Sequence, residues 1–97
     1  VGKADCKSGG GERQFGLPVG LCVADDVVYV CDRNNNRIVV LGTDLSWRYT
    51  FGRKGSGNGE FDQPTSVAAH GDELYVVDFG NRRVQARRPL APRPLRV

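Results

Sequence analysis

The chain repeats itself at an interval of 46 residues, and the two copies align without a gap. The stretch "DRNNNRIVV" at 32–40 returns as "DFGNRRVQA" at 78–86, so Asp, Asn and Arg come back at the same mutual spacing. A repeat constrains the fold strongly, because each copy is one supersecondary unit that must stack on its neighbours to bury apolar surface. The matched pairs include Gly9 with Gly55, Phe15 with Phe61, Pro18 with Pro64, Tyr29 with Tyr75, Asp32 with Asp78, Asn35 with Asn81, and Arg37 with Arg83.

Each copy consists of short apolar runs separated by turn residues. In the first copy these runs are rich in β-branched and aromatic residues, and they predict strands at 19–24, 27–31, 37–41 and 47–51. The connections are too short for crossover helices, so neighbouring strands must be antiparallel. The second and third runs are apolar at nearly every position, which indicates burial on both faces of the sheet. Other copies of the same sheet can provide that cover, and this arrangement is a β-propeller.

The residue pattern resembles the NHL repeat. The second copy, "NGEFDQPTSVAAHGDELYVVDFGNRRVQ", has the family's Gly-x-Phe-x-x-Pro, an apolar strand, Leu-Tyr-Val-x-Asp and then Asn-x-Arg-Val-Gln. The first copy, "RQFGLPVGLCVADDVVYVCDRNNNRIVVL", matches nearly as well, and the resemblance covers roughly residues 9–85. It implies a blade of a six-bladed propeller. Such repeats occur in tripartite-motif ubiquitin ligases, where they bind proteins or RNA, and also in peptide-amidating lyases and bacterial sensor kinases.

We therefore expect an all-β protein, a partial β-propeller of about two antiparallel four-stranded blades from a six-bladed ring. Residues 1–13 are expected to be the end of a preceding blade or a linker, and 14–52 the first NHL blade. Residues 53–88 are expected to be a second, incomplete NHL blade without its fourth strand, because the pattern is lost after Gln85. An Arg- and Pro-rich disordered tail is expected at 89–97, and the absence of Met suggests a fragment or a processed chain.

The polar residues common to both copies are interpreted as parts of the blade. An Asp after the second strand can bond the turn that follows, an Asn tolerates the left-handed backbone of a tight turn, and an Arg across the hairpin can pair with the Asp. A residue set that returns in every blade is expected to build the blade rather than bind a ligand. These structural residues are Asp32, Asn35 and Arg37 in the first copy and Asp78, Asn81 and Arg83 in the second.

Recognition is expected in residues that differ between the copies. In an antiparallel meander, the loops between strands two and three lie at the same end as the crossings between blades. This end is basic, whereas the loops of the opposite end are acidic, and a basic surface favours acidic or phosphate-bearing partners. The predicted partner is a protein or single-stranded RNA, with an ordinary solvated surface as the alternative. This basic rim consists of Arg33, Arg53, Lys54 and Arg82 as free cations, with Phe79 as its one candidate for base stacking.

The sequence predicts no catalytic residues, no metal site and no cofactor. His70 is the only histidine and has no neighbouring ligands, and the three cysteines form no CxxC pair. Cys22 and Cys31 lie in apolar runs and are expected to be buried thiols of a reducing, cytoplasmic compartment. The glycine loop at 52–61 lacks the Gly-Lys-Ser/Thr and the helix of a phosphate-binding loop. No apolar run approaches the length of a membrane span.

Together these features predict a non-catalytic scaffold that binds a protein or RNA. The resemblance implies the substrate-recognition part of a ubiquitin-ligase-type protein, although the chain has no RING or B-box cysteine array of its own. Two alternatives remain, namely an incomplete fragment without independent function and a metal-dependent, lyase-like enzyme. Two blades leave sheet faces and edges bare, so further NHL repeats or self-association are needed to cover them.

Overall fold

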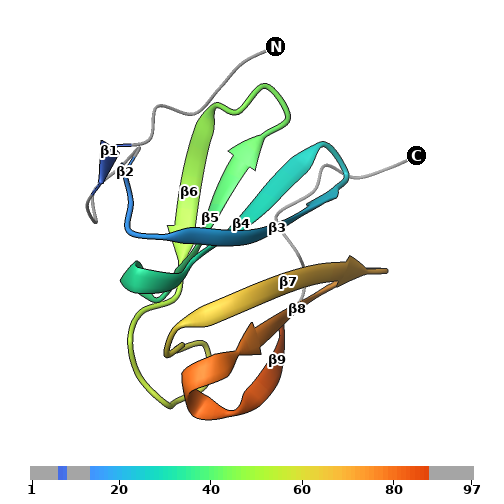
Figure 1. The fold of residues 1–97 in the computed structure, drawn as a ribbon. Helices are drawn as coiled ribbons and strands as arrows, with labels where there is room; N and C mark the ends of the chain where they lie inside the picture. The colour runs from blue at the N-terminus through green and yellow to red at the C-terminus, as the bar shows by residue number, and fades with distance from the viewer. Residues whose placement is uncertain (1–6, 9–13, 88–97) are drawn as a thin grey trace.

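The computed structural model describes residues 7–8 and 14–87, and these residues form strands joined by turns (Figure 1). The prediction of an all-β chain is confirmed. No helix within the described residues has the length and apolar character needed to cross a membrane. The elements are β1 (Lys7–Ser8), β2 (Gln14–Phe15), β3 (Pro18–Ala24), β4 (Val27–Asp32), the 3-10 turn η1 (Arg33–Asn35), β5 (Arg37–Gly42), β6 (Trp47–Phe51), β7 (Pro64–His70), β8 (Glu73–Asp78), the 3-10 turn η2 (Phe79–Asn81) and β9 (Arg83–Arg87).

The strands form two antiparallel sheets that follow the order of the chain. The first blade is the four-stranded meander β3-β4-β5-β6, and the second blade is the three-stranded meander β7-β8-β9. In the first blade the strands begin and end within one residue of the positions expected from the apolar runs. The same pairing recurs in both blades: Cys22 lies opposite Tyr29, and Ala68 lies opposite Tyr75, 46 residues later. The chain is therefore a partial propeller of two blades.

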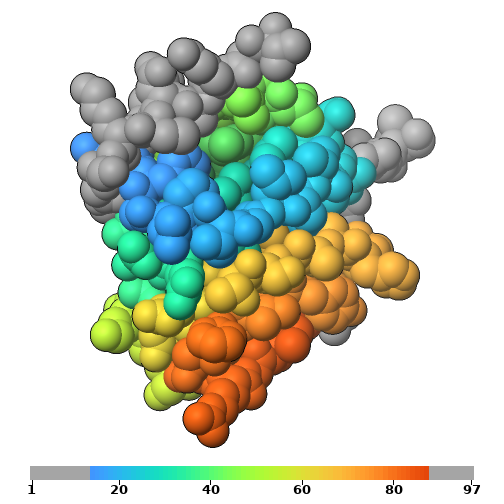
Figure 2. Space-filling view, viewed as in Figure 1, coloured from blue at the N-terminus to red at the C-terminus, as the bar shows by residue number. Residues whose placement is uncertain are grey.

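The two blades stack face to face, with the inner strands β3 and β7 side by side (Figure 1). In the space-filling view the blue β3 lies directly on the yellow β7 (Figure 2). Apolar side chains from facing sheets fill the space between them, and burial of this surface is the main force that holds stacked blades together. The inter-blade core consists of Val27, Tyr29, Cys31, Ile38 and Val40 from the first blade, with Phe61, Val67, Leu74 and Val76 from the second blade and the segment before it.

The first blade is buried on both faces, as its continuous apolar runs predicted. Every residue of β4 is buried, and so is every residue of β5 after Arg37. On the face away from the second blade, the ring of Phe15 packs edge-on against Trp47 at a centroid distance of 5.4 Å. In contrast, β9 has no buried residue, because its far face has no neighbouring sheet within the described residues.

In the hairpins β4–β5 and β8–β9, the residue with left-handed backbone was predicted one position too early. Asn35 and Asn81 lie inside the 3-10 turns η1 and η2, and the left-handed residues are Asn36 (φ 54°) and Arg82 (φ 55°). Three residues must turn right-handed to form the 3-10 turn before the chain can reverse, so the left-handed residue follows the turn. Asn35 and Asn81 instead use their side-chain amides.

The crossing from the first blade to the second repeats as faithfully as the strands do. Within it, Lys54 forms a parallel bridge with Phe61, and Ser8 pairs with Phe15 in the same way 46 residues earlier. The crossing begins at Gly52, whose φ of 97° disfavours any side chain. The predicted tail at 89–97 and most of the predicted segment 1–13 lie outside the described residues.

Candidate binding rim

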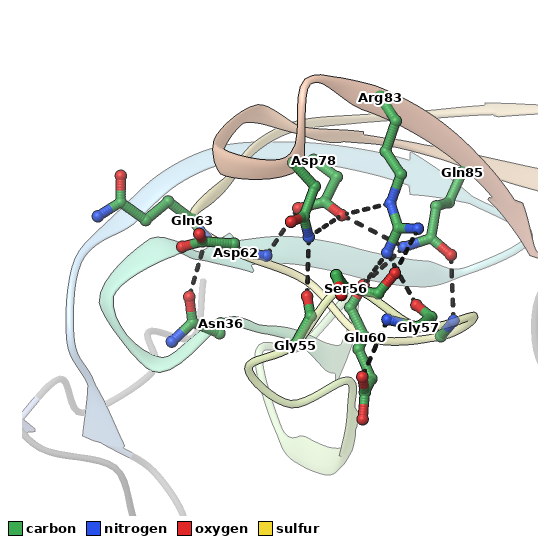
Figure 3. A network of polar contacts seen from close by, with 12 residues as sticks. Asn36, Gly55, Ser56, Gly57, Glu60, Asp62, Gln63, Asp78, Arg83 and Gln85 are labelled. Carbon is green, nitrogen blue, oxygen red and sulfur yellow. Dashed lines mark hydrogen bonds and ion pairs between the residues drawn. The ribbon is translucent and has the colours of Figure 1, made fainter.

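A buried carboxylate at the end of the middle strand organises the rim of the second blade. Asp78 is fully buried, and its Oδ1 accepts a hydrogen bond from the backbone N–H of Asp62 at 2.7 Å. Its Oδ2 accepts from Asn81 Nδ2 at 2.9 Å and from Arg83 Nε at 2.8 Å (Figure 3). The predicted Asp–Arg pair is therefore present. We call Asp78, Asn81 and Arg83 the second clasp.

The second clasp holds the crossing segment as well as its own hairpin. The guanidinium of Arg83 donates three hydrogen bonds to backbone carbonyls of the crossing, and the amide of Asn81 donates a fourth (Figure 3). Because Arg carries several donors in a fixed planar geometry, one side chain can join several carbonyls to a carboxylate. The accepting carbonyls, at 2.7 to 2.9 Å, belong to Gly55, Ser56, Gly57 and Glu60.

The first blade has the same arrangement, and we call Asp32, Asn35 and Arg37 the first clasp. Asp32 is fully buried, and its Oδ2 accepts from Asn35 Nδ2 at 2.9 Å and from Arg37 Nε at 3.1 Å. Arg37 also donates to the carbonyl of Gln14 at 2.7 Å, just as Arg83 donates to Glu60, the residue 46 positions later. The repeated Asp, Asn and Arg therefore tie each blade to the segment that precedes it.

The donors around Asp78 lower its pKa. Burial of the carboxyl acts in the opposite direction, but the hydrogen bonds from the Asp62 N–H, Asn81 and Arg83, together with the Arg83 charge, outweigh it and hold the pKa below its usual range. The carboxylate is therefore ionised at neutral pH and pairs with the guanidinium. Its environment stabilises a fixed charge at the base of the rim.

Gln85 belongs to this network and was missed by reasoning from the repeat. Its Nε2 donates to the carbonyl of Glu60 at 2.6 Å, and its Oε1 accepts from the N–H of Gly59 at 3.0 Å. The corresponding residue of the first copy is Val39, which is buried on the outer face of the first blade. A search for residues shared by both copies therefore passes over Gln85, although the Arg-Val-Gln of the family pattern includes it.

The basic rim is not the set of free cations that the sequence suggested. Arg53 Nε lies 2.9 Å from Glu60 Oε2, so the expectation of an unpaired Arg53 was wrong. The crossing loop closes between Lys54 and Phe61 and brings the two charges together across seven residues. The pKa of Glu60 lies below its usual range, first because the Gly57 N–H donates to it and then because of Arg53.

The remaining rim residues occupy three different places. Arg33 donates from Nη2 to Gln63 Oε1 at 3.2 Å, across the boundary between the blades, and its buried Nε has no hydrogen-bond partner within the described residues. Lys54 is exposed on the crossing. Phe79, 59 % exposed, and Arg82 both line one shallow hollow of about 470 Å³ on the second blade. The structure therefore brings together only Phe79 and Arg82.

The described residues offer no metal centre. No group of three His, Cys, Asp or Glu side chains within 7–8 and 14–87 could hold a metal ion. His70 ends β7 at the other end of the strands from the rim. Cys22 and Cys31 are free thiols; Cys31 is buried as predicted, whereas Cys22 is only partly buried. Burial, followed by the nearby Cys22, raises the pKa of Cys31 to about 12.

Antiparallel meanders that stack face to face, each joined to the next by a crossing at the same end, are the blades of a β-propeller. Residues 15–41 match the family model of the NHL repeat. This stretch of the chain is thus an NHL repeat, and it runs from Phe15 in β2 through the first clasp to Leu41 in β5. No curated protein matches the chain in a sequence search.

Proposed function

We propose that this propeller segment is a non-catalytic binding scaffold that uses the rim of its second blade to hold an acidic, partly apolar protein segment. In the setting that the NHL resemblance suggests, such a rim would serve as the substrate-recognition part of a ubiquitin-ligase-type protein. The free thiols of Cys22 and Cys31 support a reducing, cytoplasmic setting for it.

The observation that carries the proposal is the contrast between repeated and unrepeated residues at the rim. The clasp residues are bound to one another and to backbone carbonyls. In the second copy Phe79 and Arg82 stand at the positions that Arg33 and Asn36 hold in the first copy. The side chains of Phe79 and Arg82 are exposed. An exposed aromatic ring beside a guanidinium provides an apolar contact and a charge-assisted hydrogen bond for one ligand.

The surroundings of Phe79 favour a protein over RNA. The aliphatic side chains of Val77 and Val84 also line the hollow, together with the clasp residues Asp78 and Arg83. Among the described residues that line it, Phe79 is the one aromatic residue. Binding of single-stranded RNA usually needs several stacking rings along a basic groove. The pairing of Arg53 with Glu60 further reduces the positive charge available to a nucleic-acid backbone. RNA is therefore the second candidate, supported by the one ring of Phe79 next to Arg82.

The test is selection of ligands from a random twelve-residue peptide library displayed on phage, with the 97-residue chain as bait. We expect enriched peptides to contain acidic residues beside apolar ones, and to lose at least about tenfold in affinity with Phe79→Ala plus Arg82→Glu. Arg48→Glu is the matched control, because it makes the same charge change on the exposed side of β6.

Three outcomes decide between the candidates. Peptides that bind the Arg48→Glu control normally but lose affinity for the rim variant support the protein-binding rim. No enrichment, or enrichment that the rim variant does not affect, overturns it. A labelled twelve-nucleotide RNA of mixed sequence that binds at low salt, and is lost with the rim variant, would transfer the role to RNA.

A further inference from the structure

The crossing contains the one place in the sequence where an asparagine directly precedes a glycine. Asn58 and Gly59 are both exposed, and they form the tip of a turn in which the N–H of Glu60 donates to the carbonyl of Gly57 at 3.1 Å. The φ of Gly59 is 78°, and the space beside its Cα is open. The tip therefore combines an accessible side-chain amide with a following residue that has no side chain to hinder its backbone nitrogen.

The other four asparagines of the chain do not share this combination. Each precedes Asn or Arg, whose side chain crowds the backbone nitrogen that follows the asparagine. Asn35 and Asn81 also hold their side-chain amides in the two clasps. An intramolecular reaction depends on the close approach of the two reacting atoms. Attack by a backbone nitrogen on a side-chain amide should therefore be concentrated at Asn58.

We propose that Asn58 is a site of spontaneous deamidation, that Gln85 restrains the reaction, and that the isoaspartyl product releases the crossing from the second clasp. The backbone nitrogen of Gly59 loses its proton to water or hydroxide and attacks Cγ of Asn58. The N–Cγ bond forms, the Cγ–Nδ2 bond breaks, and Nδ2 leaves as ammonia with a proton taken from the solvent. Water then opens the cyclic succinimide at either of its carbonyls. One product is an ordinary aspartyl residue, and the other is an isoaspartyl residue, in which the backbone runs through Cγ.

Gln85 on β9 holds the nitrogen that must attack. Its Oε1 accepts the N–H of Gly59 at 3.0 Å, and its Nε2 donates to the carbonyl of Glu60 at 2.6 Å, so one side chain bonds both residues that follow Asn58 (Figure 3). An N–H that donates to a fixed oxygen must leave it before it can lose its proton to solvent, as in amide hydrogen exchange. The reaction therefore proceeds from a locally opened crossing, and its rate depends on how often the contact with Gln85 breaks.

The isoaspartyl product lengthens the backbone between two carbonyls that Arg83 holds. Arg83 Nη2 donates to the carbonyl of Gly57 at 2.8 Å and to that of Glu60 at 2.9 Å, on either side of position 58. An isoaspartyl residue inserts one extra backbone carbon between them. Because the guanidinium is rigid and planar, it keeps both bonds only while these carbonyls keep their spacing. The aspartyl product has the normal backbone and leaves the second clasp intact. These steps are independent of what the basic rim binds.

The test is peptide mapping by mass spectrometry of the full 97-residue chain during incubation in mildly alkaline buffer. We expect the mass gain of amide hydrolysis at position 58, divided between two products that chromatography separates, while the other asparagines stay intact. Gln85→Val introduces the residue that the first copy has there and should deamidate about fivefold faster, because one hydrogen bond no longer opposes the opening. Ala86→Ser, on the opposite face of β9, is the matched control and should react at the parent's rate. Asn58→Gln should block the reaction, since its side chain would have to close a larger ring.

Each part of the proposal has an outcome that overturns it. Conversion at position 58 that is no faster than at the other asparagines refutes the site, and equal rates in the parent and in Gln85→Val refute the restraint. The separated isoaspartyl form should unfold at a lower urea concentration than the parent, whereas Asn58→Asp should stay close to the parent. Equal midpoints for all three refute the release of the clasp.

A second measurement applies if circular dichroism shows that Gln85→Val has lost its fold. The parent chain in urea below its unfolding transition then replaces the variant, because mild urea increases local opening. Hydrogen exchange of the Gly59 N–H and deamidation of Asn58 should rise together as urea is added. Deamidation that does not follow this exchange overturns the restraint by Gln85.

Discussion

Substitution of Asp78 by Asn should destabilise the second blade while leaving its shape almost unchanged. The side chain is fully buried, and the amide is nearly isosteric with the carboxylate. Asn can still accept the N–H of Asp62 through its remaining oxygen. Its NH₂ group, however, would face the donors that now bond Oδ2. These are Asn81 Nδ2 at 2.9 Å, Arg83 Nε at 2.8 Å and Gln85 Nε2 at the longer distance of 3.4 Å.

The magnitude follows mainly from the two short hydrogen bonds that are lost, those from Asn81 and Arg83. A hydrogen bond to a charged group contributes about 1.5–3 kcal/mol, and a buried donor without a partner adds its own desolvation cost. Arg83 keeps its bonds to the carbonyls of the crossing and is 29 % exposed, so water offsets part of its loss. We therefore expect the free energy of unfolding to fall by about 3 kcal/mol, a large fraction of the stability of a small domain.

Urea unfolding at pH 7, followed by Trp47 fluorescence and by circular dichroism, measures this change. The midpoint should fall while the slope against urea stays constant, because the native fold exposes no additional surface. Asp26→Asn is the matched control, since Asp26 is exposed in a turn with φ 63° that Asn also tolerates. It should stay within about 0.5 kcal/mol of the parent. If Asp78→Asn is equally neutral, the second clasp does not stabilise the blade and our reading of the repeat is wrong.

Two further predictions concern the crossing and the acid response. Gly52→Ala should lower the free energy of unfolding by about 3 kcal/mol, because a Cβ at this φ of 97° would lie 2.5 Å from the Phe61 ring. Gly59→Ala, where φ is 78° and the space is open, should cost only about 1–2 kcal/mol in the same urea titration; equal losses would contradict the steric account. The folded pKa of Asp78 lies below its unfolded value of about 3.9. Its contribution is therefore complete above that pH and is lost as the pH falls through the folded pKa, so thermal unfolding between pH 5 and 2 should be less pH-dependent in Asp78→Asn. If the melting temperature of Asp78→Asn depends on pH as that of the parent does, other carboxyl groups govern the acid response.

Much of the fold could be predicted because the sequence states it twice. The apolar runs of the first copy located β3 to β6 within one residue, and continuous apolarity correctly indicated that β4 and β5 are buried on both faces. The left-handed position was misplaced because Asn is the usual signal for it. In the second hairpin that position is held by Arg82, a residue type that gives no such signal.

The candidate site was harder to predict because it depends on how a loop closes. The pair of Arg53 and Glu60 exists because the crossing turns back on itself through the bridge of Lys54 with Phe61. Nothing in a glycine-rich segment fixes that closure in advance, since glycine permits many backbone paths. The spacing of Asp, Asn and Arg did predict an ion pair. It did not show that the Arg would also hold the carbonyls of the preceding segment.

The hydrogen bonds from Arg83 to the preceding segment determine where such a protein can be divided or duplicated. Arg83 in the second blade grips carbonyls at 56, 57 and 60, which precede the first strand of that blade. A chain boundary placed directly before Pro64 would separate the Arg83 guanidinium from these three carbonyls. A boundary at Gly52 would keep the guanidinium and the carbonyls in the same polypeptide. The segment that folds as one unit therefore begins before the first strand of its sheet. Gene fusions or excisions with boundaries chosen from the sheet alone should yield less stable proteins.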